Sequence, residues 1–322
     1  MKRTGWNYLM TRYPALFALI FLSAALLTNF VLQPNMFAGE TINSNLRVFL
    51  PVILLAVGQA VVIIGGGIDI SVGSIVSIVN AILATQVGLN GTPEDMWKFM
   101  LLSLGVGLLA GAINGFFIAF LRLQPIITTY ATSFLFAGFA LWVLPNPGGG
   151  IPSQFAQFYR TSTPLGIPLA VYIILFVLLI WLYIRSTRYG NYLFAVGGKA
   201  TAAYETAVPV TWVQFSTYVV SGFMSALGGI AITLLSGAGN AEIGAAMTLT
   251  SITAVVIGGT MMSGGIGGVA GPIMGAVTLG VIQNIISFAQ IDTWWETLVK
   301  ASIIVVALAA PGVINLFQRR QS

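Results

Sequence analysis

Gly65-Gly66-Gly67-Ile68-Asp69-Ile70-Ser71-Val72-Gly73 lies between two long apolar runs, 49–64 and 75–89. Each glycine costs a helix about 1 kcal/mol relative to alanine, so three in succession predict that a helix ends here. Asp69 places a carboxylate between two membrane-length segments, where an ionisable group is costly and needs partners. Asp69 and Ser71 are both residue types that cap a following helix. The stretch therefore predicts a spanning helix, a break, and a new helix whose amide N–H groups point into the break.

The composition is that of a membrane protein. Of the 322 residues, 57% are hydrophobic and 7% are charged, whereas a soluble domain carries about 25% charged residues. The chain has no histidine and no cysteine, which excludes disulfides, imidazole or thiolate metal sites, and histidine or cysteine catalysis. The net charge of +5 is assigned to lysines and arginines kept on the cytoplasmic side of a membrane rather than to nucleic-acid binding. No cofactor and no nucleic-acid partner are expected.

Apolar runs of about 20 residues predict helices that cross the bilayer. We expect an all-α, polytopic membrane protein with about ten transmembrane helices in a single domain, 1–322. Breaks are expected near 65–73 and 263–268. The basic start followed by an apolar run too long for a signal peptide is interpreted as the first span. The predicted spans are roughly 14–32, 47–64, 71–89, 98–121, 125–144, 166–184, 212–236, 247–263, 268–289 and 297–316.

The distribution of charge predicts the orientation. With the N-terminus in the cytoplasm, most lysines and arginines fall inside, as the positive-inside rule requires. Both termini are basic, which favours an even number of spans with both ends cytoplasmic. The residues predicted inside are Lys2, Arg3, Arg12, Arg122, Arg185, Arg188, Lys199, Arg319 and Arg320, and those predicted outside or near the outer face are Arg47, Lys98, Arg160 and Lys300.

Two polar loops differ in character. The segment 145–168, predicted outside, is rich in proline and glycine and either covers a pore, meets an external partner or is a plain connector. The segment 185–211 is the one sizeable loop predicted inside. Its part 199–207 has helical composition, and Pro209 ends it. A short amphipathic helix at the membrane face would be available to a partner protein.

The two halves of the chain share a glycine pattern. Val62-Ile63-Ile64-Gly65-Gly66 recurs as Val255-Val256-Ile257-Gly258-Gly259, and a glycine-rich turn follows at 263–268. Paired glycine-interrupted segments indicate a transport pathway, although chance matches arise in a chain with 37 glycines. Gly197-Gly198-Lys199 is similar to the end of a phosphate-binding loop, but Leu193 and Ala200 break the pattern. The sequence thus encodes no ATP site, and any energy from ATP must come from another chain.

Small and polar residues within the spans have two interpretations. Gly105, Gly107 and Gly111, and Gly271 with Gly275, recur at helical spacing, which favours close helix packing over lining of a pathway. Buried amides and hydroxyls suit a neutral sugar, but singly each is more often an interhelical hydrogen bond. Asp69 is either part of a pathway or a helix cap without a transport role. The broken-helix and pathway candidates are Gly66, Gly67, Asp69, Ser71, Asn114, Thr128 and Asn284; Gln59, Asn80, Thr129, Thr132 and Gln283 are further buried polar residues.

These residues carry a family resemblance. Gly66-Gly67-Ile68-Asp69-Ile70-Ser71-Val72-Gly73 resembles the Gly-Gly-Ile-Asp-Leu-Ser-Val-Gly motif of permease subunits of ribose-type sugar ABC importers, with Ile70 for leucine. The resemblance covers about residues 45–310. It continues through Thr187-Arg188-Tyr189-Gly190, Ala195-Val196-Gly197-Gly198, Ala202-Ala203, Tyr218, Ser221-Gly222, Ala226, Gly228-Gly229, 252–260, Gly264-Gly265, Gly271, Gly275-Ala276 and Lys300.

The resemblance implies a permease that moves a monosaccharide, a pentose or hexose, across the bacterial inner membrane into the cytoplasm without catalytic residues of its own. It implies a dimer with a second copy or a related permease, an ATP-binding subunit on the cytoplasmic side and a periplasmic sugar-binding protein. The ATPase would dock on residues about 197–209, with Gly198, Lys199, Ala202, Ala203 and Glu205 as candidates, so a bulky residue at Ala203 is expected to uncouple ATP hydrolysis from uptake.

The chain departs from the family pattern within this coupling segment. Lys199 stands where the family usually has asparagine, and Thr206-Ala207-Val208 where Ser-Gly-Ile is usual, which bears on the choice of ATPase partner. The alternatives are an ABC permease for nucleosides, autoinducers or branched-chain amino acids, or an ion-driven secondary transporter.

Overall fold

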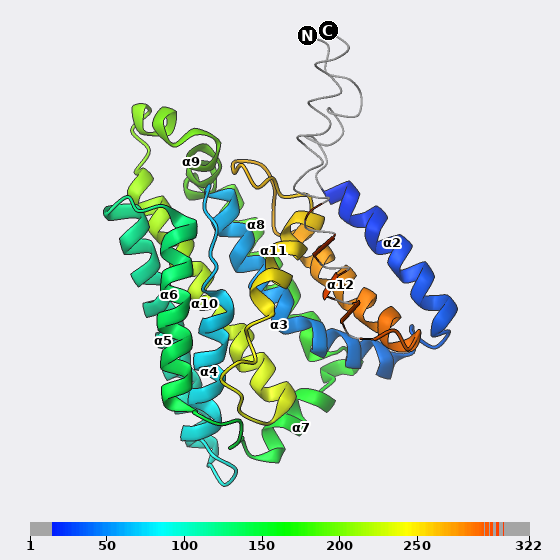
Figure 1. Ribbon diagram of the computed structural model, residues 1–322. Helices are drawn as coiled ribbons and strands as arrows, with labels where there is room; N and C mark the ends of the chain where they lie inside the picture. Colours follow the sequence, from blue (N-terminus) through cyan, green and yellow to red (C-terminus); the bar gives the residue numbers. More distant parts are fainter. Residues whose placement is uncertain (1–14, 293, 296, 299–300, 303–304, 306–322) are drawn as a thin grey trace.

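The computed structural model describes residues 15–292, 294–295, 297–298, 301–302 and 305, and within them the chain is a bundle of helices without a strand (Figure 1). A single β-bridge joins Gly148 to Gly239. A π-helical turn, η1, continues α5, and a 3-10 turn, η2, follows α7. The elements are α2 (Ala15–Leu32), α3 (Gly39–Ile64), α4 (Val72–Gln86), α5 (Pro93–Gly115), η1 (Phe116–Phe120), α6 (Pro125–Val143), α7 (Ser153–Thr161), η2 (Pro164–Gly166), α8 (Leu169–Ser186), α9 (Arg188–Glu205), α10 (Val210–Ser236), α11 (Met247–Ile257) and α12 (Ala270–Phe288).

The all-α prediction is confirmed, whereas the count of about ten spans is not. Among the described residues, six helices are long and apolar enough to cross a membrane: α3, α5 with η1, α6, α8, α10 and α12. Three other predicted spans coincide with shorter apolar helices in α2, α4 and α11. Glycine-rich turns, rather than charges, precede α4 and follow α11. The tenth predicted span, 297–316, falls largely outside the described residues.

Close backbone contacts position α10 at the centre of the bundle. It packs against α3, α4 and α5. A Cβ atom added at Gly107 or Gly111 of α5 would overlap backbone carbonyls of α10, and one at Gly222 of α10 would overlap the Gly107 carbonyl. The predicted packing role of Gly107 and Gly111 is therefore confirmed. The same prediction for Gly105 is wrong, because this glycine faces open space with nothing within 4 Å of an added Cβ.

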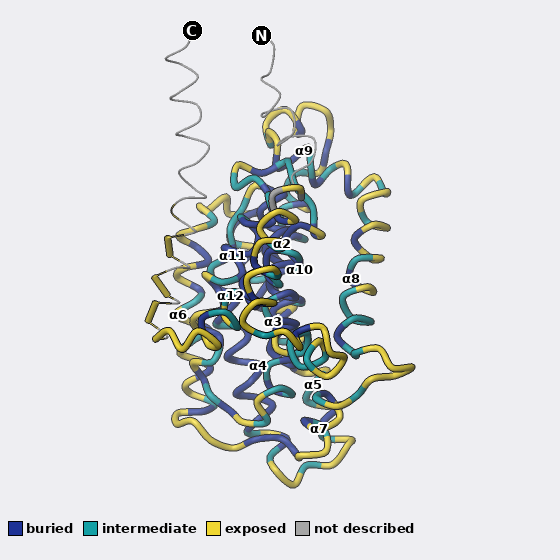
Figure 2. The backbone as a smooth tube through the Cα atoms, turned by 90° about the vertical axis from the view of Figure 1, so that its right-hand side faces the viewer, coloured by how far each residue is buried: buried dark blue, intermediate teal, exposed yellow. Residues whose placement is uncertain are grey.

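The α11–α12 contact is built in the same way. An added Cβ at Gly271 would overlap the Gly258 carbonyl, and one at Gly275 would overlap the Ala254 carbonyl. The peripheral helix α8 instead exposes large apolar side chains, among them Leu175, Phe176 and Leu179, and Figure 2 colours most of it as intermediate or exposed. A helix with an apolar exposed face suits contact with lipid, because its own backbone groups are all paired internally.

The two ends of the bundle differ, with α9 at one end and α7 at the other (Figure 1). At the α7 end, the Arg160 guanidinium donates to the carbonyls of Leu235 and Ser236, the last residues of α10. The carbonyl of Arg160 in turn accepts hydrogen bonds from Asn43 and Arg47 of α3. The segment 145–168 is therefore tied to the start of α3 and the end of α10.

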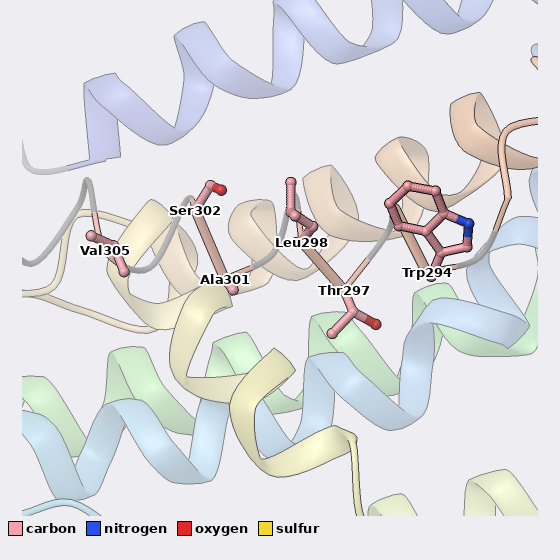
Figure 3. A pocket seen from close by; sticks show the side chains of 6 residues that line it. All are labelled: Trp294, Thr297, Leu298, Ala301, Ser302 and Val305. Atoms are coloured by element: carbon pink, nitrogen blue, oxygen red, sulfur yellow. The ribbon is translucent and has the colours of Figure 1, made fainter.

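A cavity beyond α12 is lined by one stretch of chain (Figure 3). It offers few polar groups, the hydroxyls of Thr297 and Ser302 and the Trp294 indole among them. It does not adjoin either helix break, so we do not assign it a role in transport. Its lining residues are Trp294, Thr297, Leu298, Ala301, Ser302 and Val305.

Candidate functional site: the two broken helices

The first break begins with a glycine-dependent end to α3. Gly66 adopts φ of +86°, a left-handed conformation that favours glycine. Its N–H donates to the Ile63 carbonyl (2.9 Å), and the Gly67 N–H donates to the Val62 carbonyl (3.0 Å). These paired bonds form a Schellman motif, which satisfies carbonyls that the helix itself leaves without partners. Gly67 has a second role, because an added Cβ would overlap the buried Tyr218 hydroxyl.

Gln59 of α3 holds the backbone of the break. In the amide orientation that satisfies both of its polar atoms, the Gln59 side chain donates to the Asp69 carbonyl (3.0 Å) and accepts from the Asp69 N–H (3.2 Å). Gln59 is completely buried. It therefore bonds to both backbone polar groups of Asp69, which have no partner within a helix. Unwound backbone inside a membrane protein requires such partners.

The Asp69 carboxylate is completely buried and accepts three hydrogen bonds. One oxygen, Oδ1, accepts from the Ser71 N–H (2.9 Å) and the Ser71 hydroxyl (2.7 Å). The other, Oδ2, accepts from the Ser221 hydroxyl of α10 (2.7 Å). All three donors are neutral, and all three donate to the carboxyl group, as an ionised carboxylate requires.

The hydrogen bonds continue from Ser71 to two further helices. Asn114 of α5 donates to the Ser71 hydroxyl oxygen (2.7 Å), and Thr132 of α6 donates to Asn114 Oδ1 (2.6 Å). Asn114 thus lies beside the first break. The chain of bonds joins α10, the break, α5 and α6 through polar side chains that are all buried.

Threonines from two helices bind the free amides of the break. The Ile70 N–H donates to Thr129 Oγ1 of α6 (3.1 Å), and the Gly73 N–H donates to Thr248 Oγ1 of α11 (3.1 Å). Together with the side chains named above, these two threonines form a buried group of hydrogen-bonded polar residues that we call the Asp69 network. Its members are Gln59, Asp69, Ser71, Asn114, Thr129, Thr132, Ser221 and Thr248.

The structure corrects two sequence predictions for the break and places two of the pathway candidates away from it. Ser71 occupies the N-cap position of α4, but its side chain does not cap the helix and binds Asp69 instead. The amides of residues 70, 71 and 73 do not point into an open break, because side chains of the network accept from them. Thr128 and Asn284 lie apart from the network: Thr128 donates to the Gln124 carbonyl of its own α6, and Asn284 donates to Asn45 near the start of α3.

Sequence reasoning missed Ser221 and Thr248 as members of the network. Small hydroxyl residues are frequent within spanning helices, so their presence there carries no local signal. The appearance of Ser221-Gly222 in the family resemblance is the one sequence feature that could have pointed to Ser221.

The second break repeats the geometry of the first. Gly259 has φ of +78°, its N–H donates to the Val256 carbonyl (3.0 Å), and the Thr260 N–H donates to the Val255 carbonyl (3.2 Å). The glycine pattern that the two halves of the chain share therefore corresponds to the same Schellman motif at the end of α3 and at the end of α11. The turn that follows, within 258–269, contains Gly264, Gly265 and Gly267 with positive φ before α12 begins.

The predicted coupling segment forms part of α9. The helix begins earlier than expected, at Arg188, and Lys199 (φ −160°, ψ 98°) divides it into two helical stretches. Gly198, Lys199, Ala202 and Glu205 are exposed.

Ala203 differs from the other coupling candidates, because it is 5% exposed and packs within the main apolar core. Its carbonyl accepts the Val208 N–H (3.1 Å), which folds the chain back after α9. A bulky residue at this position would disturb that packing, so the predicted Ala203 substitution does not report on a partner alone. Nearby Ala207, where the resembling family usually has glycine, has φ of +62°.

Comparison with known proteins finds relatives that match most of the chain. The family model for the permease component of branched-chain amino acid transport systems matches residues 41–308. The ribose import permease protein RbsC of Haemophilus influenzae is 30% identical over 292 residues, 88% of this chain and 89% of the relative. RbsC of Escherichia coli K12 is 30% identical over 91% of each chain. The autoinducer 2 import system permease protein LsrD of Photorhabdus temperata is 27% identical over 97% of this chain and 92% of the relative. No solved structure matches the chain.

Proposed function

Because the chain belongs to the family of branched-chain amino acid transport system permease components, a family of membrane subunits rather than enzymes, we propose that it moves a monosaccharide into the cytoplasm as part of an ATP-driven importer. The observation that carries this proposal is the exposed second stretch of α9, which lies at the same end of the bundle as both helix breaks. An ATP-binding partner on this surface would act next to the two points where spanning helices are interrupted.

The proposed substrate is a pentose or hexose. The similarity to ribose import permeases over nearly nine-tenths of both chains supports this class. The autoinducer 2 permease covers as much of the chain at lower identity, so an autoinducer is the alternative. The absence of histidine and the small number of charged residues also favour a neutral, hydroxyl-rich solute over an ionised one.

The distribution of exposed charge supports placing the α9 end in the cytoplasm. Arg122, Arg185, Arg188 and Lys199 are exposed at or near this end, whereas Glu40, Glu94 and Glu242 are exposed toward the α7 end. Lysine and arginine concentrate on the cytoplasmic side of membrane proteins. The chain would then lie in the bacterial inner membrane with both termini cytoplasmic.

Three partners complete the proposed importer. An ATP-binding subunit would dock on the exposed residues of α9, and a second permease copy or a related permease would complete a dimer. A periplasmic sugar-binding protein would dock at the α7 end, where Arg160 fixes α7 against α3 and α10.

Reconstitution in proteoliposomes tests the proposal. The permease is reconstituted with and without a candidate ATP-binding subunit and a candidate sugar-binding protein, and uptake of radiolabelled ribose, a hexose and autoinducer 2 is compared. Uptake of a sugar that requires both partners and ATP is expected. Uptake by the permease alone, driven by a proton or sodium gradient, would instead show a secondary transporter.

The exposed face of α9 predicts a contrast between adjacent alanines. Ala202→Trp is expected to leave the melting temperature unchanged and to reduce copurification of the ATP-binding subunit by about tenfold, which corresponds to about 1.4 kcal/mol of binding free energy. Ala203→Trp is expected to lower the melting temperature as well, because overpacking of a core costs about 1–3 kcal/mol.

Asn191→Trp, on the first stretch of α9, provides a matched control, since Asn191 is exposed outside the docking residues. Thermal unfolding and pull-down of the detergent-purified variants measure the two effects. If Ala202→Trp binds the ATP-binding subunit normally, α9 is not the docking segment.

A further inference from the structure

The two helix breaks are in direct contact. The Gly265 N–H, from the turn before α12, donates to the carbonyl of Ile64, the last residue of α3 (2.9 Å). The last carbonyls of a helix have no partner within the helix, so this bond satisfies one of them across two segments far apart in sequence. An added Cβ at Gly264 would lie 2.9 Å from Gly66 Cα, so the two turns touch backbone to backbone.

Gly197 of α9 is inserted at the same point. An added Cβ at Gly197 would overlap the Ile64 carbonyl oxygen and lie 2.7 Å from the Gly265 nitrogen. An added Cβ at Gly264 would lie 2.6 Å from the Gly197 carbonyl oxygen. We call Gly66, Gly197, Gly264 and Gly265 the glycine junction. In it, the backbones of α9, the first break and the second break meet with no side chain between them.

The absence of side chains makes this contact stiff. A side chain placed between two segments can change rotamer and absorb a small displacement, whereas backbone atoms in van der Waals contact cannot. Close-packed interiors have low compressibility and transmit strain. The neighbouring Gly198 has nothing within 4 Å of an added Cβ, so the close approach is specific to one face of α9.

We propose that the glycine junction locks α9 and the two broken turns into one rigid unit, so that a displacement of α9 reaches both helix breaks together. This rests on the proposed function, in which an ATP-binding subunit displaces α9. The first break anchors the Asp69 network, and the second turn leads directly into α12, so one displacement would act on both halves of the chain. Gly197 is thus a positioning residue of the transport cycle.

Gly197→Ala is the direct test, with Gly138→Ala as the matched control. Gly138 lies on the exposed face of α6 with nothing within 4 Å of an added Cβ, so both variants exchange a helical glycine for alanine. In the reconstituted complex, Gly197→Ala is expected to retain the ATP-binding subunit and its ATP hydrolysis, while substrate uptake per ATP hydrolysed falls at least tenfold. Gly138→Ala is expected to retain both activities.

The outcomes separate the junction from the proposed function. If the unmodified complex shows no ATP-dependent uptake, the proposed function fails. If the unmodified complex transports substrate and Gly197→Ala transports equally well per ATP hydrolysed, the proposal that the glycine junction transmits the movement of α9 is wrong. Loss of ATPase copurification in Gly197→Ala would show that the contact shapes the docking segment instead of transmitting its movement, and would also overturn the proposal.

Distance measurements provide a test that does not depend on the folding of Gly197→Ala. The chain contains no cysteine, so introduced cysteines are the sole thiols for spin labels. The pair Asn191→Cys and Ser263→Cys reports within the unit, and the pair Asn191→Cys and Gln157→Cys reports from the unit to α7; all three positions are exposed. Between nucleotide-free and ATP-bound complexes, the first distance is expected to stay constant while the second changes. A change in the first distance comparable to that in the second would overturn the rigid unit.

Discussion

Asp69→Ala is expected to lower the melting temperature of the purified permease by roughly 6 °C and to abolish most of its transport. The substitution removes the acceptor of three hydrogen bonds, two from Ser71 and one from Ser221. Hydrogen bonds to a charged group contribute about 1.5–3 kcal/mol each, and a buried donor left without an acceptor adds its own desolvation penalty. A net loss of about 4 kcal/mol corresponds to roughly 6 °C for a protein of this size.

Asp69→Asn is expected to have a smaller effect than Asp69→Ala. The asparagine oxygen can still accept both hydrogen bonds from Ser71, and the amide can donate to the Ser221 oxygen if the hydroxyl rotates. The network then changes direction at one bond without losing its shape. A smaller loss of melting temperature and uptake in Asp69→Asn than in Asp69→Ala would therefore show that the hydrogen bonds, rather than the negative charge, hold the break in place.

Glu242→Ala provides the control for loss of a carboxylate, because Glu242 is exposed and its removal should leave stability and uptake within error of the unmodified protein. Thermal unfolding and ATP-dependent uptake are the measurements. Asp69→Ala with unchanged melting temperature and uptake would contradict the assignment of Asp69 as the anchor of the break.

The helix breaks could be predicted from sequence because their cause is local. A backbone position in the left-handed region favours glycine. In both halves of the chain, the sequence of two apolar residues, isoleucine and two glycines ends its helix with the same Schellman motif. Nothing beyond the neighbouring residues is needed to form that motif. The resemblance to ribose-type permeases, drawn from the same residues, is confirmed by the family match together with the ribose import permeases among the relatives.

The members of the Asp69 network could not be predicted in the same way. Thr128 and Thr129 are adjacent in α6 and both buried, yet Thr129 binds the break and Thr128 binds its own helix. The choice depends on how α6 is rotated about its axis. In a soluble helix an apolar stripe marks the buried face, but a spanning helix is apolar toward lipid and toward protein alike, so the sequence carries little information on rotation.

The same limit applies to α9, where alanines at 202 and 203 have equal helix propensity but opposite environments. It applies as well to the glycines of α5. Gly105, Gly107 and Gly111 have similar sequence surroundings, and only the contact with α10 separates the first from the other two. Substitutions at these glycines therefore discriminate between a general effect of composition and a specific helix contact.

Gly111→Leu is expected to prevent accumulation of folded permease, whereas Gly105→Leu is expected to be tolerated. A Cβ at Gly111 would overlap the Tyr218 carbonyl oxygen and lie 3.0 Å from Val219 Cα, so a leucine there forces α5 away from α10. Separation of these helices would also pull Asn114 from Ser71, because Asn114 lies one turn further along α5. Overpacking alone costs about 1–3 kcal/mol, and the loss of the buried hydrogen bond adds to it.

Gly105→Leu is the matched control, since the same residue is introduced two turns away on the exposed face of the same helix. Leucine has a higher helix propensity than glycine by roughly 0.8 kcal/mol, so this variant should be as stable as the unmodified chain or slightly more stable. Fluorescence-detected gel filtration of detergent extracts measures the folded fraction of both. Equal, normal yields would contradict the close contact between α5 and α10, and with it the route by which Asn114 reaches the first helix break.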